Sequence, residues 1–259
     1  MERVLETIVE RSRPELEEAK RHVPASELRR RIAAAPPVRD FTGSLRKPGL
    51  RVIAELKAAS PSKGVIRQPL EVEALATELE TAGAAALSVL TERNFFLGGL
   101  ENLERARKVT TLPLLRKDFL YDEYQLLEAR AAGADAVLLI AAMLTEAEFR
   151  NLHACAESLG LAVLCEAHTR EELEMLASNG ARLIGINARN LSTFDTSLDR
   201  VAELIQRVPE GCIAVGESAI RERADLLRLH GLGAQAFLIG ETLMRAPSPG
   251  RKLCELLSK

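Results

Sequence analysis

The sequence predicts an α/β protein, a single (β/α)8 TIM barrel that carries a helical N-terminal extension. Short apolar runs recur at intervals of about 20–35 residues, and patterns typical of amphipathic helices separate them. The length of 259 residues matches the ~250 residues of such a barrel. We therefore treat 1–259 as one domain, with 1–45 as the extension. An open doubly wound sheet is the main alternative, but it would usually begin with a glycine-rich turn that opens a helix. Gly231-Leu-Gly233 precedes a strand-like run instead.

The extension should form helices before the first strand. An apolar stripe predicts a partly exposed helix near the N-terminus: Val4, Leu5, Ile8 and Val9. We expect Pro14 to kink or restart this helix, with Ser12 as a cap. A second helix should begin near Ser26 and end before Pro36. The extension could close the bottom of the barrel or border its mouth, and the sequence leaves both open.

The apolar runs are rich in valine, isoleucine and leucine, as strands buried on both faces are. They span residues 51–57, 86–90, 112–117, 135–140, 161–166, 182–187, 212–217 and 235–240. Between them, 71–81 and 123–132 have apolar residues three and four apart. Capping boxes at Thr145 and Thr169 open two more helices. Glycines that follow helical segments should end them: Gly83, Gly133 and Gly180.

Composition excludes several functions. A formal charge of −2 provides no basic field for nucleic acid or an anionic membrane. No apolar run approaches the ~20 residues of a membrane span. The cysteines have no C-x-x-C spacing, so we expect thiols in a reducing cytoplasm rather than disulfides or a metal site. They are Cys155, Cys165, Cys212 and Cys254.

Charged residues gather where the predicted strands end, which is where barrels of this type hold their active sites. Alternation along the first strand directs Glu55 and Lys57 into the barrel and Val52 towards the helices. Other polar residues end later strands: Lys117, Glu166, Asn187 and Glu217, with Arg189 shortly after. Buried charges are costly unless they are paired or used. The convergence therefore predicts an acid–base site, and His168 could border it.

Glycine-containing loops after the last two strands predict a phosphate site. One contains Ser218 and Ala219, and the other contains Gly240 and Glu241 before a short helix. Either loop taken alone could equally be a plain turn. The polar loop after the first strand adds Ser60 as a donor for an anionic ligand, although an ordinary solvated loop would look similar.

Five segments, in order, resemble the indole-3-glycerol-phosphate synthase family, and the likeness extends over essentially the whole chain. They are Glu55-Leu-Lys-Ala-Ala-Ser-Pro-Ser-Lys-Gly64, Leu87-Ser-Val-Leu-Thr-Glu92, Leu115-Arg-Lys-Asp-Phe119, Gly185-Ile-Asn-Ala-Arg-Asn-Leu191 and Gly216-Glu-Ser218. The resemblance implies a lyase of tryptophan biosynthesis that needs no cofactor. Its substrate would be the phosphosugar 1-(2-carboxyphenylamino)-1-deoxyribulose 5-phosphate, which loses carbon dioxide and water as the indole ring closes.

The resemblance also implies residue roles. Lys117 would be the general acid at the substrate carbonyl, and Glu166 and Lys57 would be the acid–base pair for the later dehydration, in an order that the sequence leaves open. Residues that would hold the substrate and the lysines in place are Glu55, Asn187 and Glu217. The anthranilate carboxylate would contact Ser60 and Arg189, and the phosphate would contact Ser218, Ala219, Gly240 and Glu241. The aromatic ring would lie against Phe96, Phe119 and Leu191.

Two residues depart from the family pattern, which usually has glycine at Ala219 and serine at Gly99. The methyl group of Ala219 could crowd the phosphate or forbid a positive φ, which puts phosphate affinity in question.

Two other functions are compatible with a barrel of this type. A related phosphosugar isomerase would use a carboxylate or cysteine as base, whereas Lys57, Lys117 and Arg189 favour the decarboxylating closure. A non-catalytic barrel would be expected to have lost part of this set. Neighbouring carboxylates should keep both lysines charged, which favours acid catalysis over a Schiff base. The sequence leaves the oligomeric state open, with a monomer as the expectation.

Overall fold

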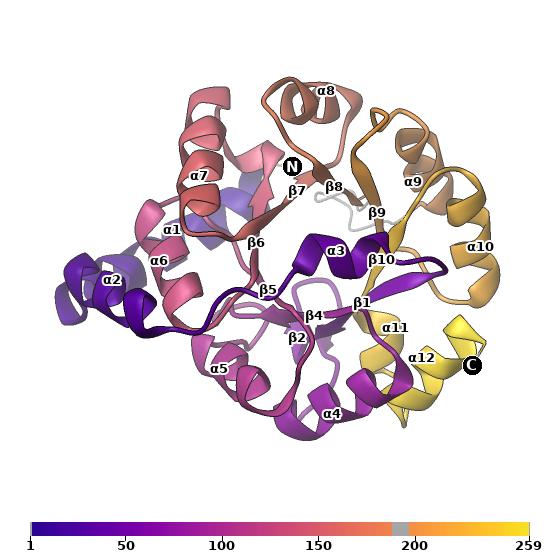
Figure 1. The fold of residues 1–259 in the computed structure, drawn as a ribbon, viewed down its shortest axis with the longest axis horizontal. Helices are drawn as coiled ribbons and strands as arrows, with labels where there is room; N and C mark the ends of the chain where they lie inside the picture. Colours follow the sequence, from indigo (N-terminus) through magenta and orange to yellow (C-terminus); the bar gives the residue numbers. More distant parts are fainter. Residues whose placement is uncertain (1, 188–196, 259) are drawn as a thin grey trace.

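Eight parallel strands close into a barrel in the order β1-β10-β9-β8-β7-β6-β5-β4, with helices around them (Figure 1). The structure is a computed structural model that describes residues 2–187 and 197–258. The barrel strands are β1 Arg51–Leu56, β4 Ala86–Leu90, β5 Leu114–Lys117, β6 Ala136–Ile140, β7 Ala162–Ala167, β8 Leu183–Asn187, β9 Ile213–Glu217 and β10 Ala236–Ile239. Each coincides with a predicted run to within two residues, so the predicted barrel is confirmed.

The helices that follow the strands form the outer ring. They are α4 Val72–Ala82, α5 Leu100–Val109, α6 Glu123–Ala131, α7 Glu146–Ser158, α8 Arg170–Ser178, α9 Leu198–Ile205, α10 Arg223–Gly231, α11 Glu241–Met244 and α12 Pro249–Leu257, with the short 3₁₀ helix η1 Ala141–Met143 before α7. Thr145 forms the predicted capping box at α7. Thr169 caps α8 by accepting from the Glu172 N–H, but the Glu172 side chain accepts from the His168 backbone N–H instead of that of Thr169, so the predicted capping box is only half formed. Gly83, Gly133 and Gly180 follow their helices with positive φ angles, as expected of helix ends.

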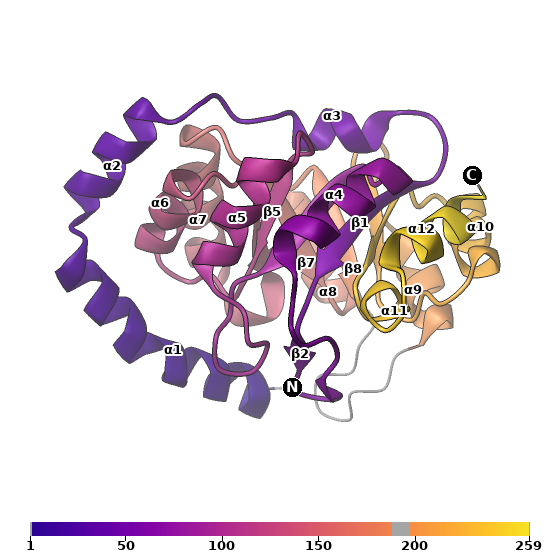
Figure 2. The same ribbon diagram turned by 90° about the horizontal axis from the view of Figure 1, so that it is seen from below.

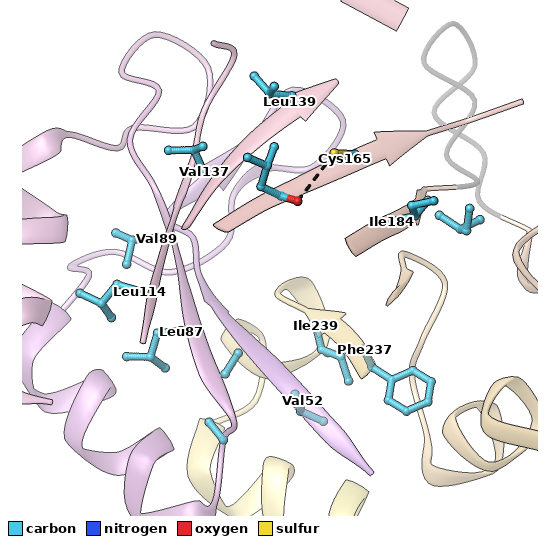
Figure 3. Close-up of a cluster of buried hydrophobic side chains, with 14 of the residues drawn as sticks. Val52, Leu87, Val89, Leu114, Val137, Leu139, Cys165, Ile184, Phe237 and Ile239 are labelled. Atoms are coloured by element: carbon cyan, nitrogen blue, oxygen red, sulfur yellow. Dashed lines mark hydrogen bonds between the residues drawn. The ribbon is translucent and has the colours of Figure 1, made fainter. Parts of the chain in front are cut away.

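Two apolar layers hold the barrel together. Alternate side chains of the strands, such as Val52, pack outward against the helices, and Figure 3 shows part of this outer layer. Within it the Cys165 thiol contacts the carbonyl oxygen of Val163. The other set, such as Ile53, fills the barrel interior. This is the alternation predicted for β1, and it sends Glu55 and Lys57 inward.

The extension contributes to both ends of the barrel. Its helices are α1 Glu2–His22, α2 Ala25–Ala34 and α3 Phe41–Arg46. Figure 2 shows α3 across one end of the barrel, while α1 reaches towards the opposite end. Phe41 and Leu45 of α3 are each 1% exposed and join the inner core. Leu5 and Ile8 of α1 instead line the cavity at the mouth.

The predicted restart of the first helix at Pro14 is wrong. Helix α1 continues through Pro14, and Ser12 bonds to the carbonyl oxygen of Val9 and to Tyr121 rather than capping a helix. Ile8 and Leu16, on either side of the proline, are both buried. Because packing against the barrel holds both halves in line, it outweighs the hydrogen bond that the proline removes.

None of the helices in the two described ranges is both long enough and apolar enough to cross a bilayer. Within those ranges, no group of three or more histidine, cysteine or acidic side chains is arranged to hold a metal ion. All four cysteines are free thiols.

Candidate active site

A cavity of about 430 Å³ opens at the carboxyl ends of the strands. Apart from His168, every candidate residue that the structure describes lines it: Glu55, Lys57, Ser60, Phe96, Lys117, Phe119, Glu166, Asn187, Glu217, Ser218, Ala219, Gly240 and Glu241. Arg189 and Leu191 lie outside the described residues. The candidate residues follow seven different strands and are far apart in sequence. They meet here because closure of the sheet brings the carboxyl ends of the strands to one opening.

Lys117 lies between two carboxylates at the centre of the cavity. Its Nζ atom is 2.7 Å from Glu166 Oε2 and 3.4 Å from Glu217 Oε2. Burial alone would lower the pKa of this lysine, but the carboxylates of Glu166, Glu217 and Glu55 outweigh burial and raise the pKa above its usual value. Lys117 is therefore an ammonium ion at neutral pH and can donate a proton.

The pKa values of Glu166 and Glu217 shift in opposite directions although both residues are buried. Burial raises the pKa of each, but Lys117 and His168 lower the pKa of Glu166 well below its usual range. Glu166 also accepts a hydrogen bond of 3.1 Å from Asn187 Nδ2. Glu217 lies close to the charge of Glu166, and its pKa is raised to about 8. A neighbouring pair with opposite shifts is suited to hold one carboxylate ionised and one carboxyl protonated.

A second ion pair lies beside the first. Lys57 Nζ is 2.7 Å from Glu55 Oε1, and both side chains are largely buried. The two lysines thus reach the cavity from β1 and β5, each with its own carboxylate. The arrangement offers proton donors at two separate points of a bound molecule.

Two glycines make room for the carboxylates. A Cβ atom at Gly240 would overlap Glu55 Oε1, and one at Gly185 would overlap Glu217 Oε1. The sequence analysis assigned Gly240 to the phosphate loop only, and it missed Gly185. A glycine inside a strand of valine and isoleucine was the available signal, since it often marks close approach by another group.

The loop after β9 contains two consecutive residues in the left-handed conformation. Ser218 and Ala219 have φ angles of 60° and 59°, and both residues line the cavity. The Ser218 hydroxyl contacts Asn187 Oδ1. Besides Lys57 and Lys117, the described residues that line the same cavity include three basic ones: Lys63, Arg221 and Arg245. Arg221 and Arg245 were not predicted, although Arg221 lies in the loop after β9 and Arg245 follows the short helix α11.

The substitution of alanine for the family's glycine does not forbid the turn, because Ala219 adopts the left-handed conformation. The methyl group makes that conformation costly by about 1 kcal/mol or more. We expect Ala219→Gly to raise the free energy of unfolding by up to about 1 kcal/mol, measured by chemical denaturation. Ala154→Gly, at an exposed site inside α7, should lower it by roughly the same amount. A destabilised Ala219→Gly variant would contradict the strain argument.

Hydrogen bonds hold the loops that follow β1 and β4. Strands β2 Ala59–Ser60 and β3 Gly64–Val65 form a small antiparallel hairpin after β1, so this loop is more ordered than an ordinary solvated one. The Ala59 N–H donates to the Phe96 carbonyl oxygen. The buried carboxylate of Glu92 accepts from the backbone N–H groups of residues 94–96. These bonds place the Phe96 ring 5.9 Å from that of Phe119, where the two form an apolar wall.

The sequence matches known proteins over nearly its whole length. The family model for indole-3-glycerol phosphate synthase matches residues 5–256. The indole-3-glycerol phosphate synthase of Koribacter versatilis is 48% identical, over 99% of this chain and 100% of that protein. The enzyme of the same name from Alkaliphilus metalliredigens is 45% identical over 98% of each chain.

Solved structures share the fold. The tryptophan synthase α-subunit of Pyrococcus furiosus superposes with a TM-score of 0.63 at 16% identity, over 81% of this chain and 98% of that one. A thiamine phosphate pyrophosphorylase from the same organism gives a TM-score of 0.59 at 18% identity, over 80% and 93%. These similarities show the (β/α)8 barrel alone. Taken with the family match and the curated relatives, they leave one assignment: the chain belongs to the indole-3-glycerol phosphate synthase family.

Proposed function

We propose that this barrel closes the indole ring of 1-(2-carboxyphenylamino)-1-deoxyribulose 5-phosphate and releases carbon dioxide and water. The observation that supports it most is Lys117, an ammonium ion held between Glu166 and Glu217 at the centre of the cavity. Attack of the aromatic carbon on the substrate ketone places negative charge on the carbonyl oxygen. A positioned ammonium supplies both the opposing charge and the proton.

The second half of the reaction needs a base and a further proton donor. The low pKa of Glu166 suits a carboxylate that removes a proton during dehydration. Lys57, fixed by Glu55 at 2.7 Å, would then assist loss of the hydroxyl group as water. Asn187 orients Glu166, and the raised pKa of Glu217 favours its neutral form, which limits the negative charge around Lys117.

The ends of the cavity suit the ends of this substrate. The phosphate would bind the turn at Ser218 and Ala219 and the adjoining residues Gly240 and Glu241, with Lys63, Arg221 and Arg245 as nearby cations. The aromatic ring would lie against Phe96 and Phe119, with Leu191 as a third contact. Ser60 has a buried hydroxyl without a partner among the described residues, and we assign it, with Arg189, to the anthranilate carboxylate.

Incubation of the purified protein with this substrate tests the proposal. We expect a fluorescent indole product to form without an added metal or cofactor. One molecule of carbon dioxide should be released for each molecule of this product. A phosphosugar isomerase would yield a rearranged sugar without indole, and a binding barrel would return the substrate unchanged. Either result would overturn the proposal. We further propose that the enzyme acts in the cytoplasm as a monomer, which gel filtration with light scattering would test.

A further inference from the structure

His168 lies immediately behind the cavity, one residue after β7 ends. It does not line the cavity, contrary to the expectation that it could border it, and only 3% of the residue is exposed. None of the roles assigned above uses this buried histidine. Its surroundings nevertheless connect it directly to Glu166.

The imidazole ring lies between two carboxylates. Its Nε2 atom is 3.2 Å from Glu166 Oε1, and its Nδ1 atom is 3.3 Å from Glu172 Oε2. The first contact is an ion pair whose angles are not those of a directed hydrogen bond. Burial lowers the pKa of the ring, but the two carboxylates outweigh burial and raise the pKa to about 9. At neutral pH the ring is therefore an imidazolium cation.

Neighbouring helices fix the ring in this position. The backbone N–H of His168 donates to Glu172 Oε2 at 2.6 Å. The Thr169 hydroxyl caps α8 by accepting from the backbone N–H of Glu172. The His168 carbonyl oxygen accepts from Arg200 Nη2 of α9 at 3.3 Å. The charged groups that face His168 are thus Glu166 from β7, Glu172 from α8 and Arg200 from α9, with Lys117 beyond Glu166.

The two oxygen atoms of Glu166 have different partners. Oε2 contacts Lys117, whereas Oε1 contacts His168 and Asn187. When Lys117 gives its proton to the substrate, it becomes neutral and no longer balances the charge of Glu166. Among the residues that the structure describes, His168 is then the cation that remains in contact with this carboxylate, since Lys57 contacts Glu55.

We propose that His168 is a positioning residue whose charge, held by Glu172, keeps Glu166 ionised and oriented after Lys117 has donated its proton. The inference rests on the proposed function. It extends the acid–base site beyond the residues that line the cavity, through a relay of ionic contacts from Glu172 to His168 and from His168 to Glu166. Removal of the cation would let Glu166 take up a proton at a higher pH, so that it could no longer act as a base.

Kinetics from about pH 3.5 to 9 test this relay; the range extends below the usual pKa of a glutamate because the pKa of Glu166 is lowered. We expect His168→Gln, which keeps a polar group but not the charge, to move the acid limb of the kcat profile upward by about one pH unit or more. Glu172→Gln keeps the His168 ring but removes the carboxylate that holds its charge. It should move the acid limb of the kcat profile upward by a smaller amount. KM should change by less than about threefold in both, since neither side chain lines the cavity.

His153→Gln is the matched control. His153 forms a pair with Glu157 at 3.4 Å on α7. The variant therefore removes a histidine–glutamate pair from a helix and leaves the surroundings of Glu166 unchanged. We expect its pH profile to coincide with that of the wild type. If His168→Gln and Glu172→Gln lower thermal stability but keep the wild-type profile, the role of His168 is structural and the inference is wrong.

Nuclear magnetic resonance of ¹⁵N-labelled histidine gives a readout that does not need activity. In the substrate-free protein, His168 should carry protons on both ring nitrogens until the pH approaches about 9, and Glu166→Gln should lower that titration point. Titration below pH 7 in the wild type would overturn the inference. An inactive wild type with the expected titration would instead overturn the proposed function, so the two failures are distinguishable.

Discussion

Replacing Lys117 with alanine is expected to lower kcat by at least about 100-fold, the lower end for a well-placed acid–base group. The substitution removes the ammonium ion that contacts both Glu166 and Glu217. It leaves the phosphate turn and the aromatic wall unchanged, so substrate affinity should stay within an order of magnitude. Steady-state kinetics together with a direct measurement of binding separate these two effects.

Lys252→Ala is the control for loss of a paired lysine, because Lys252 contacts Glu255 on α12, far from the cavity residues. It should leave kcat unchanged. Retention of more than about a tenth of the wild-type kcat by Lys117→Ala would show that another group is the general acid. Trapping of the substrate on Lys117 or Lys57 with borohydride would show covalent chemistry instead, because a Schiff base requires a neutral amine.

The barrel was predictable because its strands are buried on both faces. A run such as Ala86–Leu90 has few polar residues to obscure its bounds, and its ends agree with the structure. Helix caps such as Thr145 were equally clear, since the capping box depends on residues three apart in sequence. Features whose causes are local were therefore predicted well.

Features that depend on distant contacts were not. Helix α3 was not predicted, because its six residues are stabilised by burial of Phe41 and Leu45 against the strands rather than by local pattern. The continuity of α1 through Pro14 has the same cause. Within the site, the charges at the strand ends indicated which side chains meet, but not that the pKa of Glu217 is raised. That shift depends on burial and on the distances to Glu166 and Lys117, which only the closed barrel sets.

Gly185→Ala should be the most damaging substitution among residues that carry no reactive group. Gly185 pairs with Glu166 on the next strand and faces the barrel interior. An added methyl group would overlap Glu217 Oε1 and come within 3.3 Å of Leu164 Cδ1. The carboxyl group of Glu217 must therefore shift, which changes its position beside Lys117. Displacement of a catalytic group by about 1 Å can cost about 100-fold in rate, and we expect a loss of kcat of that size.

A double-mutant cycle identifies the cause of that loss. In a Glu217→Ala background the displaced carboxylate is absent, so adding Gly185→Ala should lower kcat little further. Gly231→Ala supplies the control, because a Cβ atom there meets no neighbouring atom, and both kcat and stability should be preserved. If Gly185→Ala lowered kcat equally in both backgrounds, the methyl group would be acting through the barrel packing and not through Glu217. Full activity of the single variant would mean that the carboxylate tolerates the shift, and that its position beside Lys117 does not limit the reaction.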